Sequence, residues 1–139
     1  MAESSAPDFT AQDLSGNEVV LSSFKGKSPV LLAFGATWCP YCRREVPNLI
    51  ALRKNFRDQD LAVLAVDVQE GREKVAAFAA AKGINYTVLL DTDGKASDRY
   101  GVTGIPFFVL VSRDGNIAAT DYSVSRRLID KIRSLIATN

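Results

Sequence analysis

The feature that most constrains this chain is a pair of cysteines, Cys39 and Cys42, the only two in its 139 residues. They lie in the segment Trp38-Cys39-Pro40-Tyr41-Cys42, which follows the apolar run 30–34. A helical pattern begins at about residue 40 and continues to about residue 56. Two thiols placed where a buried strand ends and a helix begins predict a site for dithiol–disulfide chemistry.

The rest of the sequence predicts strands that alternate with helices. We expect strands at 18–21, 30–34, 61–66, 87–90, 107–111 and 117–121, and helices at about 40–56, 71–82, 96–100 and 124–136. The run 30–34 is apolar throughout, which is typical of a strand buried on both faces. Helical crossovers favour a parallel sheet, and a late hairpin adds antiparallel strands. The prediction is an α/β fold in one domain, residues 1–139, with residues 1–8 as a loose N-terminal arm.

Charge and composition exclude several function classes. The net charge of +1 gives no electrostatic reason to expect a nucleic-acid partner, and no apolar run approaches the roughly 20 residues of a transmembrane helix. The chain has no histidine, which excludes histidine-based triads and histidine metal ligands. Its first ten residues lack the pattern of a signal peptide. We therefore expect an extracytoplasmic protein if an export signal has been removed, and a cytoplasmic one if the chain is complete.

Three interpretations of the cysteine pair compete. The two residues could be small core side chains, but a strand–helix junction beside proline and tyrosine is a poor place for complete burial. They could form half of a zinc site, yet such sites usually take four Cys or His ligands, so carboxylates or a second chain would be required. A redox dithiol is favoured, because a strand–CxxC–helix context is typical of thioredoxin-like proteins. No metal and no cofactor is then expected beyond a Cys39–Cys42 disulfide.

The two thiols are expected to have unequal roles. Cys39 lies just before the first helical turn, where unpaired N–H groups and the helix dipole stabilise a thiolate. Cys39 is therefore the predicted nucleophile that forms a mixed disulfide with a partner. Cys42, one turn along and expected to be more buried, is predicted to resolve that intermediate. Arg43 and Arg44 are interpreted as a solvated helix face.

Several segments resemble the thioredoxin superfamily, in particular its TlpA/ResA-type thiol-disulfide oxidoreductases. The matching segments are 8–9, 16–17, 21–27, Phe34 to Cys42, Pro47, Thr103 to Pro106, and Asp114-Gly115. The resemblance implies a thioredoxin fold, with a mixed central sheet flanked by helices and an N-terminal β-hairpin extension. It also implies a cis Ile105–Pro106 bond against the cysteine pair, in a loop that pairs with the main chain of a partner protein. The expected substrate-binding residues are Trp38, Pro40, Tyr41, Ile105 and Pro106.

Glu45 is the third candidate catalytic residue, one helical turn after Cys42. Members of this subfamily often carry a glutamate here, which could raise a thiol pKa or relay the proton of Cys42. A surface carboxylate paired with Arg or Lys is an equally good interpretation. The chain departs from the family pattern at Ala33, where thioredoxins carry a buried aspartate. It departs again at Pro40-Tyr41, which replaces the usual dipeptide and leaves the direction of electron flow open.

The leading functional hypothesis is a monomeric oxidoreductase that reduces, rather than oxidises, disulfides of partner proteins. The resemblance implies an upstream thiol electron donor and an extracytoplasmic role, such as keeping apocytochrome thiols reduced. One alternative is a peroxiredoxin-like thiol peroxidase, although Thr37 is two residues before Cys39 instead of the usual three. The other is a copper chaperone that uses two thiolates, although copper carriers on this fold normally add histidine.

Overall fold

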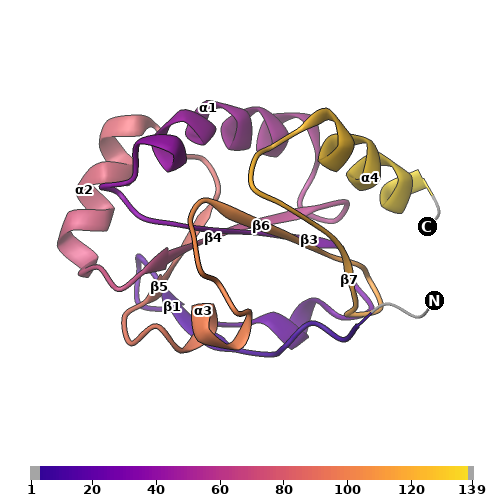
Figure 1. Cartoon of the computed structure of the whole chain (residues 1–139), viewed down its shortest axis with the longest axis horizontal. Coiled ribbons are helices and arrows are strands. Elements are labelled where there is room, and N and C mark those ends of the chain that lie inside the picture. Colours follow the sequence, from indigo (N-terminus) through magenta and orange to yellow (C-terminus); the bar gives the residue numbers. More distant parts are fainter. Residues whose placement is uncertain (1–3, 138–139) are drawn as a thin grey trace.

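The computed structural model describes residues 4–137, which form one sheet with helices on both faces (Figure 1). The strands are β1 (Thr10–Asp13), β2 (Glu18–Val20), β3 (Val30–Gly35), β4 (Ala62–Val68), β5 (Thr87–Asp91), β6 (Phe107–Val111) and β7 (Ile117–Asp121). The α-helices are α1 (Pro40–Asn55), α2 (Arg72–Lys82), α3 (Lys95–Arg99) and α4 (Arg126–Ala137), and a 3₁₀ helix, η1, spans Leu21–Phe24.

The sheet has the strand order β2-β1-β5-β4-β3-β6-β7. The central strands β3, β4 and β5 are parallel, because α1 and α2 carry the chain back across the sheet between them. The outer strands β6, β7, β1 and β2 join antiparallel to their neighbours. This arrangement confirms the predicted mixed sheet flanked by helices, and β1 with β2 forms the N-terminal hairpin that the resemblance implied.

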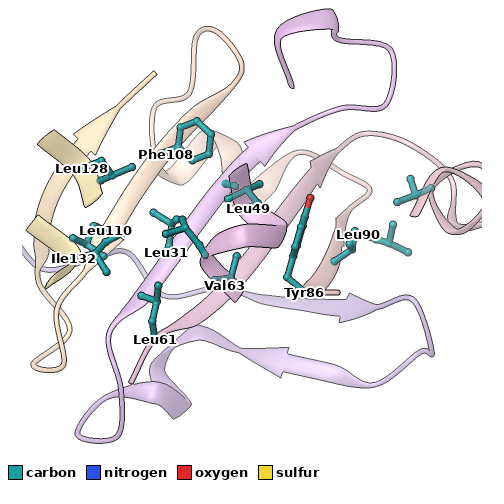
Figure 2. Close-up of a cluster of buried hydrophobic side chains, with 14 residues drawn as sticks. Leu31, Leu49, Leu61, Val63, Tyr86, Leu90, Phe108, Leu110, Leu128 and Ile132 are labelled. Atoms are coloured by element: carbon teal, nitrogen blue, oxygen red, sulfur yellow. The ribbon is translucent and has the colours of Figure 1, made fainter. Parts of the chain in front are cut away.

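Strand β3 is buried on both faces, as its continuous apolar run predicted. Leu31 and Ala33 point into a core cluster beneath α1, α2 and α4, and Figure 2 shows Leu49 of α1 and Leu128 of α4 in that cluster. Residues 30, 32 and 34 point to the opposite face, where they pack against the N-terminal hairpin and α3. The two clusters fix β3 at the centre of the fold and hold the end of β3, and so the cysteine segment, in a defined position.

The N-terminal arm differs from the prediction of a loose segment. Within residues 4–8, Ser5 forms a β-bridge with Asn116, and the N–H of Ala6 donates to the carbonyl of Gly115 at 2.9 Å. The hydroxyl of Tyr100 donates to the carbonyl of Pro7 at 2.6 Å. These partners come from the other end of the chain, so local sequence patterns do not indicate them. Residues 1–3 of the predicted arm lie outside the described residues.

One boundary of β4 and one of α4 also differ from the prediction. Strand β4 extends to Val68 instead of residue 66, which places Asp67 inside the sheet beside Gly35 of β3. Helix α4 begins at Arg126 instead of residue 124, because Ser125 caps it: the Ser125 hydroxyl accepts the N–H of Leu128 at 3.1 Å. Within residues 4–137, no helix has both the length and the apolar character required to cross a membrane.

Candidate active site

Cys39 is the N-terminal cap of α1. Its backbone is extended (φ −84°, ψ 115°), and its Sγ accepts the N–H of Cys42 at 3.2 Å. Pro40 occupies the first helical position, where its fixed φ suits the turn and its missing N–H removes no hydrogen bond. A backbone N–H aimed at the sulfur stabilises negative charge on that atom. The sequence therefore places Cys39 where a thiolate nucleophile is favoured.

The loop before β6 covers Cys39. The Cys39 thiol donates to the carbonyl oxygen of Ile105 at 3.8 Å, although the two residues are 66 positions apart in the chain. The Ile105–Pro106 bond is cis, as the resemblance implied, and Pro106 is buried. Strand β6 follows this proline and pairs with β3, which leads into the cysteine segment. Antiparallel pairing of β3 and β6 thus brings the two predicted halves of the site together.

The relative burial of the two thiols is the reverse of the prediction. Cys39 is only 3% exposed, whereas Cys42 is partly exposed. The difference arises because Cys39 turns back toward the N–H of Cys42 and the Ile105 carbonyl, while Cys42 faces a cavity. Both cysteines are free thiols, so the structure shows the reduced dithiol. Exposure therefore does not single out Cys39, and its distinguishing features are the two backbone contacts.

Exposed aromatic side chains lie next to the cysteines in the sequence. Trp38 is 62% exposed and Tyr41 is 64% exposed, and Pro40 is also exposed. Sequence reasoning missed a third aromatic, Tyr122, which is 66% exposed and packs on Phe107, the residue after Pro106, at 5.4 Å between ring centroids. A tyrosine after a strand carries no signal of this placement. Together these side chains offer contact area to an approaching polypeptide.

The two arginines after Cys42 are exposed, in agreement with their interpretation as a solvated helix face. Arg43 also donates to the carbonyl of Thr37 at 3.0 Å, and the guanidinium of Arg44 lies 4.9 Å from the centroid of the Tyr41 ring. Arg43 and Arg44 therefore hold the segment around the thiols in place.

A cavity of about 60 Å³ lies beneath Cys42. Its lining is mostly apolar, and its acidic groups are Cys42, Glu45 and Asp67, with the Tyr86 phenol alongside. Burial raises the pKa of the Cys42 thiol to about 12, and its hydrogen bond to Cys39 and the charge of Asp67 act in the same direction. Cys42 is therefore a protonated thiol at neutral pH, and it must lose its proton before it can attack a disulfide.

Glu45 lies on the rim of this cavity, but its carboxylate is already engaged. One oxygen accepts the side-chain amide of Asn48 at 2.8 Å, and the other accepts the backbone N–H of Val124 at 3.2 Å. The structure thus gives Glu45 neutral donors in place of the Arg or Lys partner of one interpretation. The other interpretation, a proton relay for Cys42, stays a prediction.

Sequence reasoning missed an acidic pair near the thiols, Asp67 and Glu70. Glu70 accepts the hydroxyl of Thr37 at 2.6 Å and its N–H at 2.7 Å, and it pairs with Lys74 at 3.0 Å. Burial acts to raise the pKa of Glu70, but these bonds from Thr37, together with those to Asp67 and Lys74, outweigh it and lower the value to about 2. Glu70 is thus an ionised anchor for the turn that leads into Cys39. The sequence signal that could have identified this pair is an acid at the carboxyl end of a parallel strand, because functional groups in α/β folds lie at that edge of the sheet.

Within residues 4–137, no three His, Cys, Asp or Glu side chains are grouped so that they could hold an ion.

Known proteins resemble this chain over most of its length. The model of the AhpC/TSA family matches residues 2–120. The thiol-disulfide oxidoreductase ResA of Bacillus subtilis (strain 168) is 37% identical over 114 residues, which cover 82% of this chain and 63% of that relative. The chain therefore spans less than two thirds of the length of this relative.

Two solved structures share the fold. A candidate thiol:disulfide interchange protein DsbE from Chlorobium tepidum superposes with a TM-score of 0.89 at 27% identity, over 98% of each chain. A secreted disulfide oxidoreductase from Mycobacterium tuberculosis superposes with a TM-score of 0.79 at 28% identity, over 91% of this chain and 96% of that one. The predicted thioredoxin-like fold is confirmed by these structures.

Proposed function

The chain belongs to the AhpC/TSA family, and from the geometry of its two thiols we propose that it is an oxidoreductase that reduces disulfides in partner proteins. One observation carries the proposal. The Cys39 sulfur lies between the N–H of Cys42 and the carbonyl of Ile105, so a nucleophile and a neighbouring thiol lie beside the loop that precedes β6. The names of ResA and of the secreted mycobacterial oxidoreductase support the same activity.

The reaction follows from this arrangement. The Cys39 thiolate attacks one sulfur of a partner disulfide, so that a mixed disulfide forms and the other partner sulfur leaves as a thiolate. The Cys42 sulfur then attacks Cys39, the bond to the partner breaks, and a Cys39–Cys42 disulfide remains. Two electrons pass from the dithiol to the partner. An upstream thiol donor restores the dithiol by the reverse exchange.

Partner recognition is assigned to the exposed groups around Cys39. The backbone of Gly104 and Ile105 is available to an extended chain, and Trp38 and Tyr41 supply apolar contact area beside it. One copy of the chain contains every group named here, so we propose that it acts as a monomer. No cofactor other than the cysteine pair is required by these steps.

The proposed direction is reduction. A dithiol becomes a strong oxidant when its reduced form is stabilised, as happens when a thiolate is stabilised. The Cys39 sulfur accepts the N–H of Cys42, but its other contact is the Ile105 carbonyl oxygen, which disfavours negative charge on the sulfur; this limits the stabilisation of the thiolate and supports a reductant. The mycobacterial protein, which is described as secreted, supports an extracytoplasmic site of action. From the resemblance to TlpA/ResA-type proteins, we propose that the chain keeps exported thiols reduced, such as those of apocytochrome.

The test is to trap partner proteins as mixed disulfides and to measure the reduction potential of the cysteine pair. A Cys42→Ser variant should accumulate mixed disulfides with partner proteins, and a Cys39→Ser variant should accumulate none. The reverse pattern would exchange the two roles, and trapping by neither would contradict the function. Equilibration of the wild type with glutathione should give a potential far below about −120 mV, the value of a strong oxidant. A potential near that value would contradict the direction.

The peroxidase alternative loses support in the structure. The hydroxyl and the N–H of Thr37, the residue on which this alternative depends, both donate to Glu70. No observation favours peroxide as the substrate. Consumption of hydrogen peroxide as fast as disulfide reduction would reverse this conclusion.

A further inference from the structure

Asp67 is a buried acid that the proposed exchange reaction leaves unused. Its side chain lies near the end of β4, and the residue is 8% exposed. Its Oδ1 is buried and has no hydrogen-bond partner among the described residues. An unsatisfied buried carboxyl oxygen is costly, and most buried polar atoms in proteins avoid that state. This oxygen therefore requires an explanation.

The sheet register directs Asp67 toward Cys42. Asp67 is the direct neighbour of Gly35 across the parallel pair β3–β4, so its side chain leaves the sheet on the same face as a side chain at Gly35 would. A Cβ on Gly35 would lie 3.2 Å from the Sγ of Cys42. The glycine thus leaves space beside the Cys42 sulfur on the face of the sheet that the Asp67 side chain shares. Asp67 and Cys42 line the same cavity there.

Several charged or titratable groups surround this carboxyl. They are Cys42 and Glu45 from α1, Glu70 from the loop after β4, Lys74 from α2, and Tyr86 from the segment before β5. Burial raises the pKa of Asp67 to about 8, with the hydrogen bond and charge of Glu70 acting in the same direction and Lys74 opposing them. Burial also raises the pKa of Tyr86, which stays neutral. Asp67 is therefore the group in this cavity that changes charge near neutral pH.

Resting on the proposed dithiol exchange, we propose that Asp67 accepts the proton of the Cys42 thiol when Cys42 resolves the mixed disulfide. The proton passes from the Cys42 sulfur to the ionised Asp67 carboxylate, directly or through a water molecule in the cavity. The Cys42 sulfur then uses its freed electron pair to bond to the Cys39 sulfur. The bond from Cys39 to the partner breaks, and the partner sulfur leaves with that electron pair. The proton finally passes to the departing thiolate or to solvent.

Asp67 is better placed for this task than Glu45. Both oxygens of Glu45 already accept hydrogen bonds from Asn48 and Val124, whereas one oxygen of Asp67 is free. A carboxylate that is harder to ionise is also a stronger base toward a thiol. The charge of Asp67, and not that of Glu45, is among the influences on the Cys42 thiol.

The test uses the reduced full chain and the aromatic disulfide 5,5′-dithiobis(2-nitrobenzoate) in a stopped-flow absorbance experiment. The first coloured thiolate reports attack by Cys39, and the second reports resolution by Cys42. At pH 8, Asp67→Asn should slow the second phase by about a hundredfold, the lower end of the contribution of a general base, and leave the first phase unchanged. Asp130→Asn, the same chemical change at an exposed position of α4, should alter neither phase.

The pH profile separates proton transfer from a structural effect. In the wild type, the second-phase rate should rise with pH and level off above about pH 8, where Asp67 is ionised. In Asp67→Asn the second-phase rate should be lower at neutral pH and rise about tenfold per pH unit up to about pH 9.5. The reason is that without the Asp67 carboxylate only the Cys42 thiolate reacts, and its fraction rises about tenfold per pH unit. A second phase within twofold of the wild type in the variant would overturn the inference. A wild-type profile without the plateau would also overturn it, even if the variant failed to fold.

The two proposals fail in different ways. If the wild type releases no thiolate from the probe in either phase, the dithiol exchange itself is wrong, and this inference fails with it. If both phases appear and Asp67→Asn resolves normally, the exchange reaction stands and only the role of Asp67 is overturned.

Discussion

Asp67→Asn should make the protein more stable than the wild type at alkaline pH. The folded-state pKa of Asp67 is raised by burial and by Glu70 to about 8, from an ordinary value of 3.8. Between these two values the folded state holds a proton that the unfolded state has released. The free energy of unfolding of the wild type therefore falls as pH rises through this window, and the fall ends near pH 8.

The magnitude follows from the width of the window. Each pH unit inside it removes about 1.4 kcal/mol of stability, so the contribution of Asp67 drops by about 2.5 kcal/mol between pH 6 and pH 9. The asparagine amide still donates to Glu70 but carries no charge at any pH, so the variant escapes this loss. The difference in unfolding free energy between variant and wild type should thus grow by about 2.5 kcal/mol over this range.

Urea unfolding of the reduced proteins at each pH, followed by far-ultraviolet circular dichroism, measures this difference. The raised pKa of Cys42 contributes its own loss near pH 9, but that loss occurs in both proteins and largely cancels. Asp130→Asn supplies the control for a change of net charge. A difference that stays constant from pH 6 to pH 9 within about 0.5 kcal/mol would refute the assignment of Asp67 as the buried group that titrates.

Three other substitutions test separate parts of the structure. Glu70→Gln removes the carboxylate that anchors Thr37 and should lower the unfolding free energy at pH 7 by about 2–3 kcal/mol, as measured in urea; a loss below about 0.5 kcal/mol would contradict the anchor. Tyr122→Ala should raise the KM for a protein disulfide several-fold while the first-phase rate with the small aromatic disulfide stays unchanged, and equal effects on both would exclude a role in docking. Leu128→Ala, at a fully buried position of α4, should lower the free energy of unfolding by about 2–5 kcal/mol. A thermal midpoint within about 2 °C of the wild type, about the smallest shift that can be resolved, would contradict the place of Leu128 in the core.

The central strands and helices could be predicted because their signals are local. An uninterrupted apolar run such as 30–34 can be buried only between two layers, and Pro40 and Gly83 mark a helix start and a helix end by their backbone preferences. The residue pattern alone does not indicate strand β1, which only the resemblance implied, because Thr10–Asp13 is short and mostly polar and is defined by its pairing with β2 and β5. Pairing partners far away in the chain leave no local pattern.

The site could be predicted only in part for the same reason. The cysteine motif and the Ile105-Pro106 loop are recognisable as segments, and the structure brings them together. Asp67 after an apolar run looks like an ordinary strand end, and its importance depends on the register that sets it opposite Gly35. The burial of Cys39 was likewise set by the loop around Ile105, which local sequence does not place.

The position of Asp67 also gives a physical account of Ala33. Thioredoxins, which this chain resembles, carry a buried aspartate where Ala33 lies, and its loss would leave Cys42 without a nearby acid. Ala33 and Gly35 point to the same face of β3, and their neighbours on β4 are Ala65 and Asp67. Three small residues out of these four leave open the cavity that Asp67 and Cys42 share. An acid on the adjacent strand then reaches the same sulfur through space that a larger side chain at position 33 or 35 would fill, so the small residues and the displaced acid are parts of one arrangement.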